Sequence, residues 1–139
     1  MEMVETFEEM LGQTINKIWI NEDNDTLIFE TTGGGFCYQT EADCCNQVWF
    51  EHISLSPKLY GSYVMGVEDK GWNELSSPSA YEVLENAFYT ITTSNGYIDM
   101  EVRNSNNGYY GGRVKFVDPL VWDRYNIRKD YMLSITEDF

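Results

Sequence analysis

Apolar and polar residues alternate along much of this chain, a period-2 pattern typical of β-strands that bury one face. Short polar or glycine-rich segments separate the strand-like runs, including residues 21–25 and the triple glycine 33–35. We expect a permissive hairpin turn at these glycines and a loop over residues 69–80. Before that loop, the pattern predicts strands over Thr14–Ile20, Thr26–Thr31, Phe36–Gln39, Gln47–Ile53 and Ser62–Glu68.

The clearest pattern lies between residues 86 and 117. The dipeptide Asn95-Gly96 indicates a type I′ hairpin turn, because that turn needs positive φ at both central residues. Residues 104–108 supply a second loop, and one register then places the apolar residues of three strands on one face. This register pairs Thr93 with Ile98, Ile91 with Met100, Tyr89 with Val102, Ile98 with Val114, Val102 with Tyr110 and Asp99 with Arg113. We therefore predict a three-stranded antiparallel meander in the C-terminal half.

Capping signals predict a few short helices. Thr6 and Glu9 have the spacing of a capping box, and Ser56-Pro57 and Asp118-Pro119 each place a capping residue before a proline at the first helical position. The expected helices cover residues 7–11, a turn near residue 57, and residues 118 to about 125. Residues 131–136 suit either an edge strand or a docked tail. The predicted fold class is α+β, with a mostly antiparallel sheet in a single domain spanning residues 1–139.

Composition limits the classes of function. The chain has 139 residues and carries 9 basic and 23 acidic side chains, for a net charge of −14. Most of the excess lies in residues 1–89, which hold 16 acidic and 3 basic residues. Such a charge repels phosphates, so we expect no direct binding to nucleic acid. The apolar runs are too short to span a membrane, and no signal peptide is recognisable, so the sequence predicts a cytoplasmic protein that does not bind a membrane.

Cysteine and histidine are the main candidates for catalysis or metal binding. Cys37, Cys44 or Cys45 could act as a nucleophile with His52 as its base, or the four residues could bind zinc. The cysteines lack the short spacing of zinc knuckles, and strand alternation puts His52 on the same face as Val48 and Phe50, partly buried at a sheet margin. We therefore predict no catalytic residue, no metal site and no cofactor, and the chain is expected not to be an enzyme.

The remaining candidates are acidic residues in turns or at strand ends, and aromatic residues near loops. Carboxylates can steer a basic partner, and Tyr and Trp are good anchors of protein interfaces. The predicted partner-binding residues are Glu22, Asp23, Asp25, Glu41, Asp43, Glu68, Asp69, Tyr60, Tyr63 and Trp72.

Several short motifs resemble those of an uncharacterised family of small domains found in bacteriophages and bacteria. The family typically shows a D-C-C-E-x-V-x-x-E stretch and a late S-N-G-Y-Y stretch. The matching segments here are residues 43–51, 59–62, 95–97 and 105–110, with Asn46 where the family usually has an acidic residue. The resemblance covers roughly residues 14–117 and leaves 118–139 as a C-terminal extension. It implies a phage or mobile-element context and carries no established activity.

Within that context we expect an acidic binding protein that inhibits a host defence system. An anti-CRISPR-like nucleic-acid mimic could occupy the basic channel of a nuclease effector. Two alternatives stay open: a sponge for a nucleotide signal, using Arg103, Arg113 and Lys115 near Tyr109 and Tyr110, or a small enzyme using Cys44 or Cys45 with His52. The sequence does not identify the target or the oligomeric state, and a dimer is compatible with it.

Overall fold

The computed structural model describes residues 6–43, 45–75, 82–106, 111–117 and 132–136. Within these ranges the chain is built almost entirely of antiparallel strands. The elements in chain order are the 3₁₀ turn η1 (Glu8–Met10) and the strands β1 (Thr14–Asn21), β2 (Thr26–Thr31), β3 (Gly34–Ala42), β4 (Gln47–Leu55), β5 (Ser62–Leu75), β6 (Val83–Thr93), β7 (Gly96–Asn106), β8 (Gly112–Val117) and β9 (Met132–Ile135).

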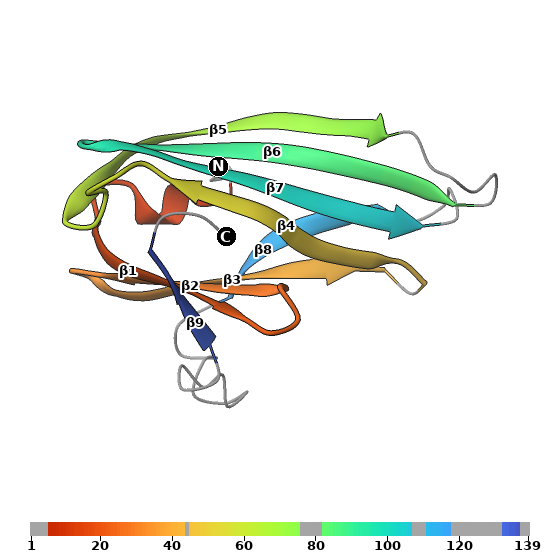
Figure 1. Ribbon diagram of the computed structural model, residues 1–139, viewed down its shortest axis with the longest axis horizontal. Helices are drawn as coiled ribbons and strands as arrows, with labels where there is room; N and C mark the ends of the chain where they lie inside the picture. The colour runs from red at the N-terminus through yellow and green to blue at the C-terminus, as the bar shows by residue number, and fades with distance from the viewer. Residues whose placement is uncertain (1–5, 44, 76–81, 107–110, 118–131, 137–139) are drawn as a thin grey trace, which may run out of the picture.

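The strands form one continuous sheet that folds over into two layers (Figure 1). The strand order is β4-β7-β6-β5-β1-β2-β3-β8, and β9 pairs with β1 beside that path. β5 and β1 join the layers through only two residue pairs, Thr14 with Tyr63 and Ile15 with Ser62. One layer therefore holds β4 to β7, and the other holds β1 to β3 with β8 and β9.

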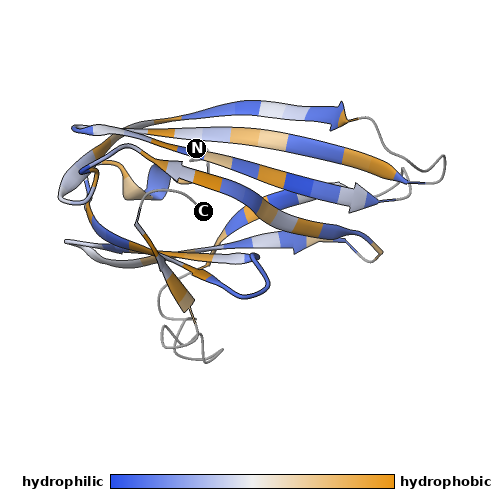
Figure 2. Cartoon of the chain, in the orientation of Figure 1, coloured by the Kyte–Doolittle hydropathy of each residue, from blue (hydrophilic) through white to orange (hydrophobic). Residues whose placement is uncertain are grey.

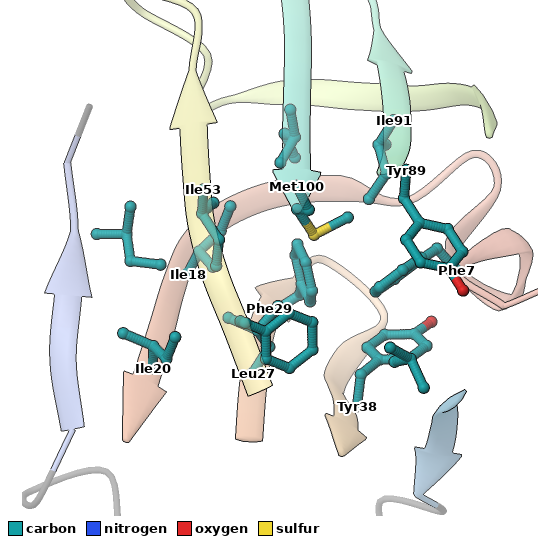
Figure 3. Packing of buried hydrophobic residues seen from close by; sticks show 14 of the residues in the cluster. Phe7, Ile18, Ile20, Leu27, Phe29, Tyr38, Ile53, Tyr89, Ile91 and Met100 are labelled. Atoms are coloured by element: carbon teal, nitrogen blue, oxygen red, sulfur yellow. The ribbon is translucent and has the colours of Figure 1, made fainter. Parts of the chain in front are cut away.

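The main hydrophobic core lies between the two layers. Hydrophobic and hydrophilic residues alternate along the strands, as the period-2 pattern predicts (Figure 2). The rings of Phe7, Phe29, Tyr38 and Tyr89 meet at one end of this core, and Phe7 lies 4.5 Å from Tyr38 and 5.4 Å from Tyr89 between ring centroids (Figure 3). η1 therefore contributes to folding mainly by placing Phe7 and Met10, both fully buried, against the strands.

A second, smaller cluster lies apart from the main core. It consists of Ile28, Cys37, Val117 and Met132, with Trp19 packed against them. Strand alternation accounts for it, because Cys37 follows the core residue Phe36 and precedes the core residue Tyr38. Burial raises the pKa of the Cys37 thiol to about 12, so this cysteine is protonated at neutral pH.

The α+β prediction is wrong, because the only helical element of the described residues is the single turn η1. Thr6 does not cap it: its hydroxyl donates to the Val114 carbonyl, and Phe7 occupies the cap position with φ 77°. The residues near 57 form a turn in which Ser56 exchanges hydrogen bonds with Tyr97. The helix expected from 118 to about 125 lies outside the described residues, whereas the strand alternative for residues 131–136 is confirmed by β9.

The β6–β7 hairpin is confirmed, but its register differs by two residues from the predicted one. Thr93 pairs with Gly96, so Ser94 and Asn95 form the turn, and neither of them has positive φ. The Thr93 hydroxyl accepts from the Asn95 N–H at 3.3 Å and donates to the Gly96 carbonyl at 2.9 Å. Since side chains alternate with a period of two, the shift keeps the same residues on the buried face.

The β2–β3 hairpin uses the same device. Thr31 pairs with Gly34, accepts from the Gly33 N–H at 3.2 Å, and donates to the Gly34 carbonyl at 2.8 Å. In both hairpins the fourth residue is a glycine with positive φ, 115° at Gly34 and 132° at Gly96. Both turns therefore share a T-x-x-G sequence. The threonine hydroxyl hydrogen-bonds to the backbone of the turn, and the glycine adopts the positive φ that other residues disfavour.

The prediction that residues 110–117 form the third strand of the meander, beside β7, is wrong. β8 pairs with β3 in the other layer, which sets Arg113 opposite Glu41 rather than opposite Asp99. The second neighbour of β7 is β4, and Asp99 lies opposite Ser54. The alternation within β8 suits any neighbour with one buried face, so the pattern alone does not choose its layer.

The five strands predicted before residue 70 are confirmed, with β5 longer than expected. β5 continues to Leu75 through a segment predicted to be a loop, pairing with β6 beyond an irregularity between Asp69 and Trp72. Gly71, with φ 79°, lies in that irregularity. A glycine there marks a β-bulge inside a strand rather than its end.

Candidate functional site

A concave feature lies where the β1–β2 turn meets the end of β3 and the start of β4. It is an open hollow of about 450 Å³. Its lining comprises Asp23 and Asp25 from the turn, Thr40 and Ala42 from the end of β3, and residues 46–49 at the start of β4. The volume is within the range of small-ligand sites.

Backbone hydrogen bonds hold the β1–β2 turn against the neighbouring strands. The Phe50 N–H donates to the Asn24 carbonyl at 2.7 Å, and the Thr40 N–H donates to the Asp25 carbonyl at 2.9 Å. Within the turn, the Asn21 side chain donates to Asp25 Oδ1 at 2.6 Å. Asn24 has φ 57°, a left-handed conformation that asparagine tolerates well. The two aspartates therefore stand on a braced turn.

A network of side-chain amides fixes the opposite side of the hollow. Asn46 donates to Asn104 Oδ1 at 2.9 Å and to the Gly111 carbonyl at 3.1 Å, and it accepts from the Asp43 N–H at 2.8 Å. Asn104 is fully buried and donates to Glu85 Oε1 at 3.0 Å. Because a buried amide is costly to leave unpaired, this network specifies where Asn46 lies.

The charge of the hollow is negative and uncompensated within the described residues. Asp23 and Asp25 line it, no Lys or Arg does, and neither aspartate belongs to an ion pair among those residues. The half-buried Trp49 is also a lining residue, and its indole N–H donates to Glu51 Oε2 at 2.6 Å. The sequence alone singles out neither Trp49 nor Gln47, because their places in the hollow depend on how the two layers meet.

Glu41 and Asp43 are neutralised by nearby cations. Arg113 Nε donates to Glu41 Oε1 at 2.6 Å, and Lys115 Nζ lies 2.8 Å from Glu41 Oε2. Arg113 also lies 3.7 Å from Asp43. The hydrogen bonds from Lys115 and then Arg113 lower the pKa of Glu41. These two acids are thus less able to attract a basic partner than Asp23 and Asp25.

The other predicted acids do not lie together. Glu22 is exposed in the same turn as Asp23, whereas Glu68 and Asp69 are exposed on β5 in the other layer (Figure 1). Asp69 accepts from the Gly71 N–H at 2.8 Å within its own bulge. The predicted acids therefore form no single array: Glu22, Asp23 and Asp25 cluster at the hollow, and β5 carries a separate pair.

The three predicted aromatic residues differ in their surroundings. Tyr63 is 49% exposed, but Trp72 and Tyr60 pack against the main core. The Tyr60 hydroxyl accepts from the Ile18 N–H at 3.2 Å and donates to the Ile135 carbonyl, so it links β1 to β9. Burial raises the pKa of Tyr60, with the hydrogen bond from Ile18 acting in the opposite direction.

A polar ladder on the outer face of β4, β6 and β7 was not predicted as a site. Arg103 donates to Glu101 at 2.9 Å and lies 3.4 Å from Glu51, while Asn86 donates to Glu101 at 3.1 Å. Burial acts to raise the pKa of Glu101, but the bonds from Arg103 and Asn86 outweigh it and the net shift is downward. One cation thus serves two carboxylates, and side-chain contacts link β4, β6 and β7 on this face.

Among the described residues, neither candidate cysteine nucleophile pairs with His52 as a catalytic base would require. A bulge between Phe50 and His52 reverses the expected alternation, so His52 is exposed, in contrast to the partial burial predicted from Val48 and Phe50. Cys37 is buried in the second cluster, Cys45 is exposed after β3, and Cys44 lies outside the described residues. Across the described ranges, no three His, Cys, Asp or Glu side chains gather as metal ligands.

No helix among the described residues has the length and apolarity to cross a bilayer. No solved structure matches the chain significantly. Over 104 residues it is 31% identical to "Uncharacterized protein L278" of Acanthamoeba polyphaga mimivirus, a match that covers 70% of this chain and 82% of the relative. A family model described as "Domain of unknown function (DUF7448)" matches residues 8–116, in accord with the uncharacterised domain family expected from the sequence motifs. Because this model matches well over half of the chain, the chain belongs to the DUF7448 family.

Proposed function

We propose that the chain is a non-catalytic, acidic binding protein that acts in the host cytoplasm against a defence protein, by occupying a basic surface that otherwise binds nucleic acid. The observation that carries this proposal is the hollow at the β1–β2 turn, where Asp23 and Asp25 have no counter-ion among the described residues. A viral relative supports the virus or mobile-element context.

The net charge of −14 supports the same kind of partner. Long-range attraction to a basic surface raises the association rate, and fixed carboxylates near an aromatic ring then provide specific contacts. The hollow and the adjoining Glu22 replace the wider set of acids as the proposed contact surface, because Glu41 and Asp43 already pair with Arg113 and Lys115.

A nucleotide sponge has weaker support. The three cations considered for it each already face carboxylates: Arg103 faces Glu51 and Glu101, while Arg113 and Lys115 face Glu41. A phosphate would have to displace these partners near an acidic surface. The alternative of a cysteine enzyme has no support either, because no cysteine contacts His52 among the residues that the structure describes.

The proposal is tested with two double variants of matched charge. D23N/D25N removes the charge of the hollow, and E68Q/D69N removes the same charge from exposed β5. Tagged wild-type and variant proteins are incubated with host lysate at about 50 mM and about 200 mM salt, a range over which phosphate-type contacts weaken strongly. Captured proteins are identified by mass spectrometry, and nucleic acid is added as a competitor.

We expect wild type and E68Q/D69N to capture the same basic, nucleic-acid-binding defence protein, and D23N/D25N to lose most of it. Added nucleic acid and higher salt should both release the captured protein. In host cells that carry that defence protein, expression of wild type but not D23N/D25N should restore viral plating. Capture that is equal in all three proteins and insensitive to salt and nucleic acid would overturn the proposal.

A further inference from the structure

The lining of the hollow identifies the chemical group that it can bind. We propose that the hollow receives the guanidinium group of an arginine side chain from the partner protein. This inference rests on the proposed function and deepens it by naming the part of the partner that is recognised.

The polar groups available in the hollow are mainly acceptors. Asp23 and Asp25 bring two carboxylates on one braced turn. Asp25 Oδ1 already accepts from Asn21 and Thr26, so its second oxygen is the one available to a ligand. The Gln47 amide has no side-chain hydrogen bond within the described ranges. Asn46 and Thr40 are already engaged, the former with Asn104 and the latter with the Val48 carbonyl at 2.8 Å. A ligand must therefore bring several donors and a positive charge.

Trp49 favours a guanidinium over a compact ammonium. Its N–H edge is fixed by Glu51, and Glu51 is held in turn by Arg103 at 3.4 Å. A guanidinium is planar, weakly hydrated and carries five N–H donors, so it can stack on an indole ring while donating to carboxylates. An ammonium has fewer donors and loses more hydration in such a site.

Other ligand classes fit the lining less well. An anion would meet two carboxylates and, among the described residues, no cation lining the hollow. A zinc site would need at least three His, Cys, Asp or Glu ligands, and no such group of three exists among the described residues. The volume of about 450 Å³ accommodates a long side chain with part of its backbone.

The experiment titrates three small probes into the full-length, ¹⁵N-labelled protein at low salt. The probes are the Nα-acetyl methylamides of arginine, of lysine, and of citrulline, which has nearly the shape of arginine without its charge. The readouts are the indole N–H signal of Trp49, assigned with W49F, and the side-chain amide signals of Gln47 and Asn46. The D23N/D25N and E68Q/D69N variants are titrated in parallel, and their amide spectra report whether each is folded.

We expect saturable shifts of these signals with the arginine probe at millimolar affinity, weaker binding of the lysine probe, and no saturable shift with citrulline. D23N/D25N should weaken arginine binding by at least about fivefold, because two ion pairs are lost, whereas E68Q/D69N should stay within about twofold of wild type. Equal shifts from arginine and citrulline, or folded D23N/D25N that binds arginine as wild type does, would overturn the inference.

The two proposals fail separately. If partner capture depends on Asp23 and Asp25 but the arginine probe does not bind, the proposed function stands and the guanidinium inference falls. If the arginine probe binds at the hollow but no basic defence protein is captured, the inference stands and the proposed function falls.

Discussion

Tyr60 offers the sharpest test of how β1, near the start of the chain, is joined to β9, near its end. Sequence reasoning placed it in a partner interface, but its hydroxyl lies between the Ile18 N–H on β1 and the Ile135 carbonyl on β9. Tyr60→Phe keeps the ring against the main core and removes only this hydroxyl. It therefore isolates the hydrogen bonds from the packing.

The expected cost follows from the two backbone groups left without their partner. A buried polar group that loses its hydrogen bond costs about 1–3 kcal/mol. Because Tyr60 is only half-buried, water can reach part of the site, so we expect the lower end for each group and a total of about 2 kcal/mol. For a domain of this size, that corresponds to a fall in Tm of about 8 °C.

The assay is urea unfolding of Tyr60→Phe beside a matched control, Tyr63→Phe. Tyr63 is 49% exposed and its hydroxyl has no hydrogen bond among the described residues, so its loss should change stability by less than about 0.5 kcal/mol. Amide hydrogen exchange should quicken at Ile18 and along β9 in Tyr60→Phe alone. Equal stability of the two variants, with unchanged protection at Ile18, would refute the linking role of the hydroxyl.

Three further predictions concern the core, the amide network and alkaline pH. Phe7→Ala removes a fully buried ring that contacts three others and should cost about 3–5 kcal/mol in chemical denaturation; Leu11→Ala, at a site 47% exposed, is the control and should cost far less. Asn104→Ala removes the acceptor of the Asn46 amide and one of the donors to Glu85, and it should cost about 1–3 kcal/mol while shifting the amide signals of Asn46, whereas an unshifted Asn46 would contradict the network. Burial raises the pKa of Cys37 to about 12 and also raises the pKa of Tyr38 and Tyr60, so these groups stay protonated in the folded state while the unfolded chain ionises. Their contribution to stability should be fully present below about pH 9 and should fall as pH rises above it, and Cys37→Ala should flatten the first part of that fall.

The strands could be predicted from the sequence because each buries one face, and that requirement appears directly as alternation. β2 shows this best, since its predicted bounds, Thr26–Thr31, are the observed ones. The hairpin at Ser94 and Asn95 was located but given the wrong turn type, because Asn-Gly was weighed without the preceding Thr93. The hydroxyl of that threonine binds the turn and moves the register by two residues.

The layer of each strand could not be predicted, because alternation is the same whichever neighbour a strand has. β8 illustrates this, since its alternating residues pair with β3 and not with β7. The expected helices failed for a related reason: capping signals at Thr6 and Ser56 are local, and both residues instead bind distant strands. Tertiary hydrogen bonds outweighed a weak local preference.

The candidate site was found only in part from the sequence. Asp23 and Asp25 were selected because they lie in a polar turn, and they do line the hollow. Trp49, Gln47 and Asn46 come from another strand connection, and their approach depends on the bond between Phe50 and Asn24 across the two layers. The neutralisation of Glu41 was equally hidden, because it required knowing that β8 lies beside β3.

The most direct test of the acidic hollow is the affinity for a fluorescent hexa-arginine peptide, measured by anisotropy from about 50 mM to about 200 mM salt. We predict that wild type and E68Q/D69N bind it with a similar, steep salt dependence, and that D23N/D25N binds more weakly with a shallower one. Identical affinities and salt slopes for the three proteins would show that the peptide senses only the net charge, and would contradict a specific site at Asp23 and Asp25.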